Sequence, residues 1–231
     1  MSVYVISDLH GMYELWTQIK NYLKPEDTLY ILGDCADRGP DGWKIIKEVL
    51  ADPRTIYIRG NHDQFILDSW KSDWRDCQLW YYNGGYETYE SIAIDENAEI
   101  FLKELSKSTF YQCYINDKGQ RFHLSHAGFT LLEGDNIPDN EDLLWDRYHI
   151  DDMCNWWIKE NPNDYVVHGH TGCVSSIFKR NSTVMNIELN KTKTLCRYAH
   201  GHKICIDGRS FISNKIAMLN LDTLKEIVFS I

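Results

Sequence analysis

Residues 28–39 read Thr-Leu-Tyr-Ile-Leu-Gly-Asp-Cys-Ala-Asp-Arg-Gly, an apolar run that ends in glycine and polar residues. The apolar part, Thr28–Leu32, predicts a buried strand, and the glycine lets the backbone turn sharply where the strand ends. Ligands bind at the carboxyl ends of strands in open α/β sheets, because the loops there converge on one edge. Asp34, Asp37 and Arg38 are therefore candidates for a functional site.

The sequence on both sides of this stretch alternates between strand and helix. Strands are predicted at Val3–Ile6 and Thr55–Ile58, where β-branched residues cluster. Apolar residues recur at helical spacing over Tyr13–Leu23 and Gly42–Leu50, and a third helix is expected from Asp63 onward. An order of strand, helix, strand, helix, strand predicts parallel strands joined by helical crossovers.

The remainder of the chain is less regular. Helices are expected at Ala98–Leu105 and Asp151–Glu160, and the turn residues Asn116–Gly119 predict a hairpin. Strands are expected at Tyr111–Ile115, Arg121–Leu124, Tyr165–Val167, Val184–Ile187, Ile204–Ile206, Lys215–Leu219 and Glu226–Ile231. The predicted fold class is α/β, with mixed sheets and outer helices in one domain that spans residues 1–231.

The chain of 231 residues carries 34 acidic and 24 basic side chains, a formal net charge of −10. This excess of acid argues against a nucleic-acid groove and against binding to an anionic membrane, because both need a basic surface. It does not exclude a phosphate-bearing substrate, because a bound cation reverses the local charge. No apolar run approaches the roughly 18 residues that a membrane helix needs.

Seven cysteines, an odd number, are scattered along the chain without a Cys-x-x-Cys pair. This spacing argues against a disulfide framework and against a zinc site built from thiolates. The first eight residues lack the charged and then apolar layout of a signal peptide. We therefore expect a cytoplasmic protein whose thiols are reduced.

Four other predicted strands are also followed by polar residues of the kind that bind metals. They are Asp8 and His10, Asn61 and His62, His126, and His170. Carboxylates, imidazoles and an amide oxygen suit divalent transition metals. Two such ions about 3.5–4 Å apart clamp the attacking and leaving oxygens of a phosphoryl transfer. A lone histidine is more often a core residue than a ligand, but five polar clusters in one order have no simple structural explanation.

Together the clusters resemble the motifs of the phosphoprotein phosphatase family of calcineurin-like metallophosphoesterases, especially its compact bacterial and phage serine/threonine phosphatases. The family reads Gly-Asp-x-His-Gly, Gly-Asp-x-x-Asp-Arg-Gly and Gly-Asn-His-Glu, and then two separate histidines. The matching segments here are Ser7–Gly11, Gly33–Gly39, Gly60–Asp63, His126 and Gly169–Thr171, with a looser match at Cys205–Gly208. The resemblance implies a sandwich of two mixed β-sheets flanked by helices.

The resemblance also implies the ligands of a binuclear metal centre. Asp8 and His10 would bind the first metal, Asp34 would bridge the two, and Asn61, His126 and His170 would complete the second. Manganese is the expected cation, with iron, zinc and nickel as alternatives because this ligand set accepts them all. The segment Asn83–Gly85 also looks like part of the family pattern, and it receives no chemical role.

Four further residues receive roles from the same resemblance. His62 would be the general acid, oriented by Asp37, while Arg38 and Arg147 would hold phosphate oxygens. The planar fork of arginine suits this position because it matches phosphate oxygens in pairs. The implied reaction is in-line attack on phosphorus by a hydroxide that bridges the metals. The predicted function is a metal-dependent serine/threonine protein phosphatase that acts on phosphoproteins or small phosphate esters.

Two positions depart from the family motifs. Ser7 replaces a glycine, with little expected effect because only the backbone is required there. Asp63 replaces a glutamate, which shortens a carboxylate that would orient neighbouring ligands. The resulting Gly-Asn-His-Asp is also similar to the symmetrical diadenosine tetraphosphate hydrolases, but these lack the Asp-Arg that Asp37 and Arg38 provide.

Two alternative functions remain beside the predicted one. The first is a dinucleoside polyphosphate or other nucleotide hydrolase, and the second is a degenerate family member that binds phosphoproteins without turnover. The segment 179–203 holds six basic residues and one acidic residue. It is either a surface that receives an acidic phosphoprotein or a solvated hairpin face.

Overall fold

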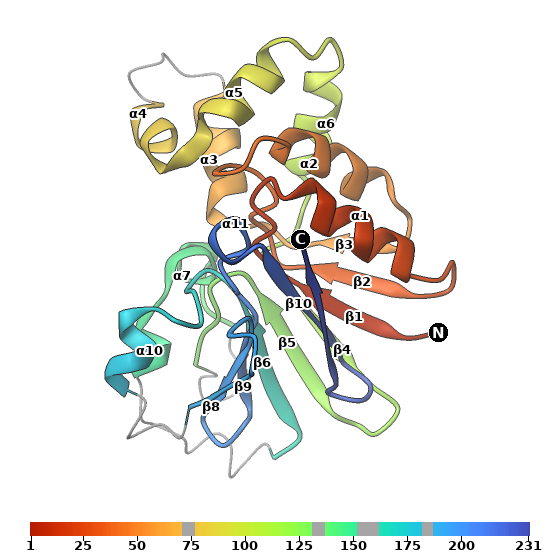
Figure 1. Ribbon diagram of the computed structural model, residues 1–231, viewed down its shortest axis with the longest axis vertical. Helices are drawn as coiled ribbons and strands as arrows, with labels where there is room; N and C mark the ends of the chain where they lie inside the picture. The colour runs from red at the N-terminus through yellow and green to blue at the C-terminus, as the bar shows by residue number, and fades with distance from the viewer. Residues whose placement is uncertain (71–76, 131–136, 152–161, 182–186) are drawn as a thin grey trace.

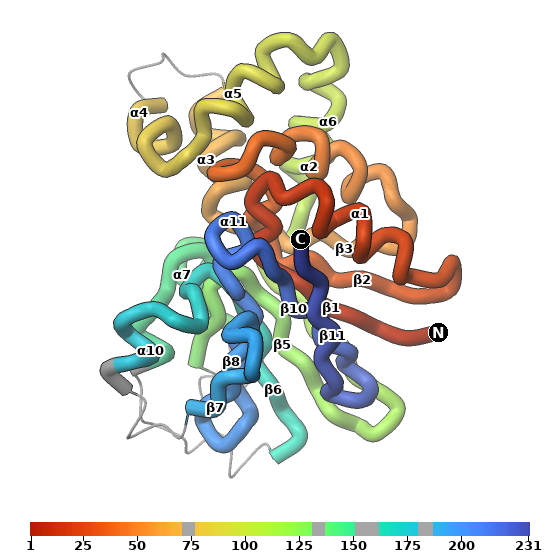
Figure 2. Tube along the Cα trace, viewed as in Figure 1, coloured from red at the N-terminus to blue at the C-terminus, as the bar shows by residue number. Residues whose placement is uncertain are grey.

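Figure 1 shows the computed structural model, in which two β-sheets and a group of covering helices form the molecule. The structure describes residues 1–70, 77–130, 137–151, 162–181 and 187–231. In the tube view of Figure 2, the N-terminus leads into β1 and the C-terminus follows β11, so both ends of the chain belong to the same sheet. None of the helices in these ranges has the length and apolar character needed to cross a membrane.

The first sheet has five strands in the order β11-β10-β1-β2-β3. Their bounds are β1 Val3–Ile6, β2 Thr28–Ile31, β3 Thr55–Tyr57, β10 Lys215–Asn220 and β11 Glu226–Ser230. β1, β2 and β3 are parallel, as their alternation with helices predicts, whereas β10 and β11 pair antiparallel. The crossover helices are α1 (Tyr13–Tyr22) and α2 (Gly42–Ala51). The three parallel strands therefore end at the same edge.

The second sheet has six strands in the order β4-β5-β6-β9-β8-β7. Their bounds are β4 Tyr111–Ile115, β5 Arg121–Ser125, β6 Asp164–His168, β7 Glu188–Leu189, β8 Cys196–Tyr198 and β9 Lys203–Cys205. β4 and β5 form the predicted hairpin, and Gly119 in its turn has a φ of 73°. β5, β6 and β9 are parallel, so this sheet is mixed as well.

The remaining helices are short and flank the two sheets. They are α3 Asn61–Ser69, α4 Gln78–Trp80, the π-helical turn η1 Tyr81–Gly85, α5 Tyr86–Ala93, α6 Ala98–Leu105, α7 Asn140–Trp145, α8 Tyr148–Asp151, α10 Ser176–Asn181 and α11 Ser210–Ser213. The helical stretch from α4 to α5 and the strand β8 were not expected from the sequence. The predicted helix Asp151–Glu160 and strand Val184–Ile187 lie outside the described residues, apart from Asp151 at the end of α8 and Ile187 just before β7.

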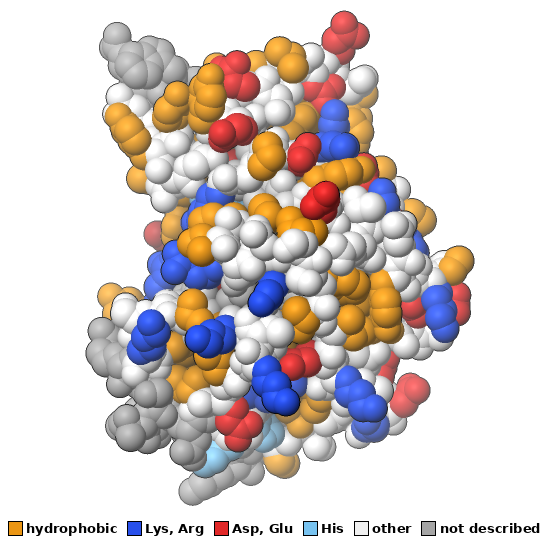
Figure 3. Space-filling view, viewed as in Figure 1, with side chains coloured by type: hydrophobic (Ala, Val, Ile, Leu, Met, Phe, Trp, Pro, Cys, Tyr) orange, Lys and Arg blue, Asp and Glu red, His pale blue; other side chains and the backbone are white. Residues whose placement is uncertain are grey.

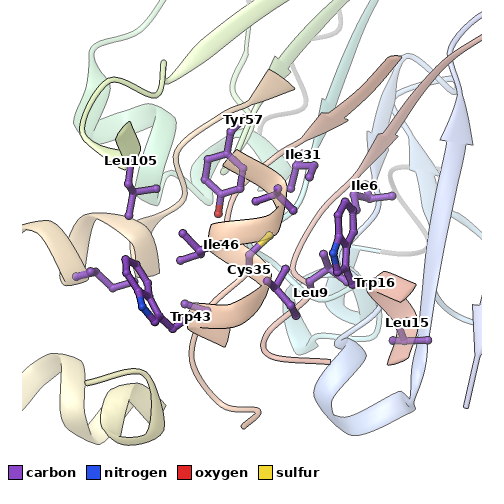
Figure 4. Packing of buried hydrophobic residues seen from close by; sticks show 14 of the residues in the cluster. Ile6, Leu9, Leu15, Trp16, Ile31, Cys35, Trp43, Ile46, Tyr57 and Leu105 are labelled. Carbon is purple, nitrogen blue, oxygen red and sulfur yellow. The ribbon is translucent and has the colours of Figure 1, made fainter. Parts of the chain in front are cut away.

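Alternate residues of β1, β2, β3 and β10 in the first sheet belong to two different cores. In β1, Val3 and Val5 pack between the two sheets, whereas Tyr4 and Ile6 pack beneath the helices. The helix-side core continues into the loops that follow β1 and β2, because Leu9 and Cys35 are fully buried in it (Figure 4). Leu9 directly follows Asp8, and Cys35 directly follows Asp34. The burial of each apolar side chain therefore fixes the backbone from which the aspartate projects.

The surface of the described residues carries mixed charge and exposed apolar side chains. On the face shown in Figure 3, basic side chains are separated by acidic and uncharged ones, and hydrophobic side chains gather around α4 and α5. Leu79, Tyr81 and Tyr82 are among the exposed apolar residues there. Lys203, within the basic segment 179–203, is buried, and its Nζ donates to Thr130 Oγ1 and to the carbonyl of His149. This lysine therefore stabilises the fold instead of receiving a partner.

Candidate metal centre and general acid

Five loops bring the predicted ligands together where β1, β2, β3, β5 and β6 end. The two sheets meet at this edge, because His126 Nδ1 donates to the Leu32 carbonyl at 2.6 Å and the His170 N–H donates to Asp8 Oδ2 at 3.1 Å. The loops approach one another closely. A Cβ on Gly33, which has a φ of 78°, would lie 2.2 Å from Gly60 N, so only glycine fits there.

The backbone is left-handed at many of the predicted site residues. The φ values are 56° at Asp8, 44° at His10, 54° at Asp34, 66° at Asp37 and Arg38, and 60° at His170. A left-handed residue that is not glycine costs of order 1–3 kcal/mol and persists only where its surroundings hold it in place. Such strain gathers at functional sites, and here it turns the polar side chains toward a common point.

Two of the histidines direct a nitrogen lone pair toward carboxylates. In His10 and His126 the Nδ1 atom donates to a backbone carbonyl, at 2.9 and 2.6 Å, which leaves Nε2 of the neutral ring as an acceptor. His10 Nε2 lies 3.6 Å from Asp8 Oδ1 and 3.8 Å from Asp34 Oδ2, and His126 Nε2 lies 3.4 Å from the same Asp34 oxygen. Acceptors that face one another in this way repel unless a cation lies between them.

Asn61 brings a third kind of ligand into the same group. Its Oδ1 atom lies 2.8 Å from His126 Nε2 and 2.9 Å from His170 Nδ1. His170 Nε2 is buried and has no hydrogen-bond partner in the described structure. An amide oxygen between two imidazole nitrogens is the arrangement expected around a transition metal, and the backbone bond of His126 fixes its tautomer for that purpose.

Burial sets the protonation of these groups. It lowers the pKa of His10 to about 4, and it also lowers the pKa values of His126 and His170, so all three rings are neutral near pH 7. Burial and then the nearby charge of Asp8 raise the pKa of Asp34 well above its usual range. Crowded carboxylates among neutral imidazoles fit divalent cations, which favour the charged form of the acids.

Arg38 reaches across this group. Its two terminal nitrogens donate to His10 Nε2 at 2.7 Å and to His62 Nε2 at 2.9 Å, and its guanidinium stacks 4.9 Å over the ring of Phe211. Arg147 lies just before α8, and desolvation followed by the charge of Arg38 lowers the pKa of Arg147. Two guanidinium groups that repel each other would together favour a doubly charged anion.

The predicted acid pair is in place beside this group. His62 Nδ1 lies 2.6 Å from Asp37 Oδ2, and both side chains are buried. The same carboxylate oxygen accepts from the indole N–H of Trp80 at 2.8 Å. Sequence reasoning missed Trp80 as a contributor, because the aromatic run Trp80-Tyr81-Tyr82 is typical of core or lid packing.

The stretch from α4 to α5 supports the loop that carries this pair. The Asp37 N–H donates to Thr88 Oγ1 at 3.0 Å, and the Arg38 N–H donates to the Gly84 carbonyl at 2.9 Å. A Cβ on Gly85 would lie 2.3 Å from Trp80 Nε1. The family-like segment Asn83–Gly85 thus holds the strained Asp37-Arg38 backbone, which gives that segment a structural role.

Both departures from the family motifs make contacts of their own. Asp63 accepts hydrogen bonds from the N–H of Gly60, the N–H of Asp34 and the hydroxyl of Tyr57, at 2.8, 3.2 and 2.9 Å. The shorter acid therefore still orients the loop of Asp34. Ser7 Oγ donates to Asp8 Oδ2 at 2.5 Å, a contact that glycine at this position would not make.

Three residues near the C-terminus complete the surroundings. Burial and the charge of Asp8 raise the pKa of Asp207 to about 8, and Ser210 Oγ donates to the Asp8 carbonyl at 2.6 Å. The ring of Phe211 lies 5.2 Å from the ring of His10. Only the looser motif at Cys205–Gly208 signalled this region in the sequence.

The chain matches known proteins over most of its length. A family model described as calcineurin-like phosphoesterase matches residues 1–174. Serine/threonine-protein phosphatase 2 of Escherichia coli (strain K12) is 26% identical over 175 residues, 73% of this chain and 78% of that protein. A symmetrical bis(5'-nucleosyl)-tetraphosphatase of Buchnera aphidicola subsp. Schizaphis graminum is 40% identical over 205 residues, 86% of this chain and 64% of that protein.

The fold is shared with a solved protein serine/threonine phosphatase from Saccharomyces cerevisiae. Its TM-score is 0.60 at 12% identity, over 100% of this chain and 79% of that one. The family match, the two mixed sheets and the acceptor-lined edge agree with one another, and the family uses divalent metals. The chain belongs to the calcineurin-like phosphoesterases.

Proposed function

We propose that this chain is a metal-dependent phosphomonoesterase whose substrates are phosphoserine and phosphothreonine proteins. The observation that carries the proposal is the buried pair of His62 Nδ1 and Asp37 Oδ2, 2.6 Å apart. A serine or threonine alkoxide is a poor leaving group and needs a proton from the enzyme, whereas a nucleoside diphosphate leaves without one. A preserved acid pair therefore favours phosphate monoesters over dinucleoside polyphosphates.

The proposal assigns the metal ligands as the sequence predicts. Asp8 and His10 would hold one ion, Asn61, His126 and His170 the other, and Asp34 would lie between them. Support comes from the lone pairs of His10 and His126 that face Asp34 Oδ2 at 3.8 and 3.4 Å. When bound, two divalent cations, proposed to be manganese, supply an activated water and neutralise charge on the phosphate.

Protein side chains would then bind the phosphate and protonate the leaving group. Arg38 must leave Nε2 of both His10 and His62, so that the first nitrogen can bind a metal and the second can carry a proton, and its planar fork is then free for two phosphate oxygens. Arg147 adds a second positive charge at the same place. His62, with Nδ1 held by Asp37, would carry a proton on Nε2 and donate it to the departing oxygen.

A substrate panel tests this proposal. Manganese-loaded protein is assayed with phosphoserine, phosphothreonine and phosphotyrosine peptides and with diadenosine tetraphosphate. We expect kcat/KM to be highest for the phosphoserine and phosphothreonine peptides, with release of inorganic phosphate. Higher kcat/KM for the dinucleotide, with a nucleoside diphosphate as product, would replace the proposal with the nucleotide-hydrolase alternative.

That second candidate has an observation in its favour. The tetraphosphatase from Buchnera aphidicola is more nearly identical to this chain than the E. coli phosphatase, 40% against 26%. A third candidate, a protein that binds phosphoproteins without turnover, predicts phosphopeptide binding by the manganese-loaded protein with no product from any substrate. The same panel therefore separates all three candidates.

A further inference from the structure

Three cysteines from separate segments meet on the outer side of the second sheet. Cys173 follows β6, while Cys196 and Cys205 lie directly opposite each other in β8 and β9. Their sulfur atoms all lie within 4.8 Å of one another, and Cys173 Sγ is 3.7 Å from Cys205 Sγ. All three side chains are buried, with exposed fractions of 3%, 0% and 0%. We call these residues the thiol cluster.

The spacing within the thiol cluster is that of sulfur atoms around a single ion. Metal–sulfur bonds of about 2.3 Å place sulfur atoms about 3.8–4.0 Å apart, in tetrahedral or trigonal coordination. The observed 3.7 Å and the upper limit of 4.8 Å require movements of only a few tenths of an ångström for each side chain. The cluster is therefore close to the geometry of a three-sulfur site.

The residues around the thiol cluster indicate which class of metal ion it would bind. The cluster lies in an apolar core with Ile150, Phe178 and Ala199. Among the described residues, no histidine, carboxylate or further cysteine completes the group. Structural zinc sites take four protein ligands and this group offers three, whereas copper(I) is stable with three thiolates. This agrees with the sequence, whose cysteine spacing argues against a thiolate zinc site.

A cavity gives access to this buried group. It has a volume of about 400 Å³, and Cys173 forms part of its wall beside Val174 and Phe178. Lys179 and Lys193 also line it, which makes the entrance attractive to anionic carriers of a metal ion. An ion can therefore reach the first sulfur from solvent and pass to the other two.

The alternative reading, a redox-active cysteine pair, fits less well. Burial raises the pKa values of all three thiols, so at neutral pH they are protonated and are poor nucleophiles toward an oxidant. Cys205 Sγ donates to the Thr171 carbonyl at 3.1 Å, and Cys173 Sγ donates to the Cys205 carbonyl at 3.4 Å. A thiophilic cation overcomes this protonation by displacing one proton for each thiolate it binds.

We propose that Cys173, Cys196 and Cys205 bind one soft monovalent cation of the copper(I) class, separately from the oxygen and nitrogen ligands of the candidate metal centre. The bound ion would join the turn after β6 to the β8–β9 hairpin. That turn also carries His170, and Cys205 Sγ contacts the carbonyl of the next residue, Thr171. Occupancy would therefore constrain the segment that bears a proposed ligand of the other site.

The test uses the full chain, reduced, stripped of metal and kept without oxygen. It is titrated with copper(I) held by a chromogenic copper(I) chelator, and the copper taken by the protein is measured. We expect one copper(I) per chain and a sulfur-to-copper absorption in the near ultraviolet. X-ray absorption of the loaded protein should show three sulfur neighbours and no nitrogen or oxygen neighbour.

Variants make the assignment specific. Cys173→Ala and Cys196→Ala should each lose at least tenfold in copper(I) affinity, while Cys77→Ala and Cys113→Ala should bind as the parent does. Circular dichroism establishes whether each variant is folded. Two cluster variants are used so that the test still stands if one of them does not fold. Absence of copper(I) uptake by the parent overturns the proposal, as does uptake that survives in both folded cluster variants.

Discussion

The candidate metal centre and the thiol cluster share the strand β6 but are built in opposite ways. β6 leads to His170 in the centre and then to Cys173 in the cluster, and β9 ends at Cys205, two residues before Asp207. In the centre the backbone is strained, with left-handed φ values at Asp8, His10, Asp34 and His170. The cluster residues have no positive φ, and two of them pair in a regular ladder.

This difference shows what each group of side chains does without an ion. The centre holds acceptors that face one another, and burial raises the pKa of Asp34 there, so we expect this group to destabilise the metal-free fold. The cluster holds protonated thiols that donate to carbonyls, so without an ion it is a hydrogen-bonded part of the core. Substitutions in the centre should therefore change function more than stability, and substitutions in the cluster should do the reverse.

The largest effect is expected for His62→Asn. The variant lacks the acid, so kcat for a phosphoserine peptide should fall by about 10²–10⁴-fold. With 4-nitrophenyl phosphate the loss should be much smaller, because nitrophenolate leaves without a proton. Steady-state kinetics on both substrates measure this, with circular dichroism as a check of folding. Equal losses on the two substrates would contradict the assignment of His62 as the acid.

The next largest effect is expected for Asp34→Asn, which should stabilise the metal-free protein relative to the parent and destabilise the manganese-loaded protein relative to it. In metal-free protein at pH 7, Asp34→Asn removes a carboxyl group whose pKa is raised by burial, and should raise the free energy of unfolding by about 1–3 kcal/mol. The asparagine oxygen can still accept the His62 N–H, which Asp34 Oδ1 accepts at 3.0 Å. With manganese at 100 times its Kd, the parent gains about 2.7 kcal/mol and the variant gains little.

Urea unfolding in the presence of chelator and in the presence of manganese measures the difference in the free energy of unfolding between variant and parent in the two conditions. Cys205→Ala is the matched variant in the other group, and it should lower the free energy of unfolding by about 1 kcal/mol in either condition. If Asp34→Asn destabilises the metal-free protein, the contrast between a strained centre and a relaxed cluster is lost.

The first sheet could be predicted because its information is local. Strands β1, β2 and β3 are short β-branched runs, and each is separated from the next by a helix with one apolar face. Parallel order then follows from the sequence alone, and it places Asp8, Asp34 and Asn61 at one edge of the sheet. The resemblance to a known family extended this to the second sheet.

Contacts between distant segments could not be predicted. The thiol cluster joins positions 173, 196 and 205, and β8, which brings Cys196 to Cys205, is only three residues long. Trp80 and Asp37 lie 43 positions apart, and nothing in the spacing of either residue signals the other. Such contacts depend on how whole elements pack, which local periodicity does not encode.

Trp80→Phe should have a smaller effect than His62→Asn, in the same direction. The indole N–H holds the Asp37 side chain in place against His62, and its loss should lower kcat for phosphoserine peptide about tenfold, equivalent to about 1.4 kcal/mol. KM should not change, because the indole contacts the acid pair and not the phosphate. Trp43→Phe is the matched control, since Trp43 Nε1 donates to Asp95 at the same 2.8 Å but elsewhere. A similar fall in kcat for both variants would show a general effect on packing.

The smallest effect is expected at Asp95, a carboxylate that stabilises the fold, unlike those of the centre. The hydrogen bond from Lys47, at 2.6 Å, and then that from the N–H of Asn97 lower the pKa of Asp95 to about 2. A lowered pKa means that the stabilisation is full above the unfolded value of about 4 and is lost as the pH falls through about 2. Because Lys47 is one-third exposed, Asp95→Asn should lower the free energy of unfolding by only about 0.2–1 kcal/mol at pH 7. The difference between variant and parent should shrink between pH 4 and pH 2, where chemical unfolding curves measure it. A difference that stays constant over this range would show that Asp95 acts through packing, and its contrast with Asp34 would then no longer be one of charge.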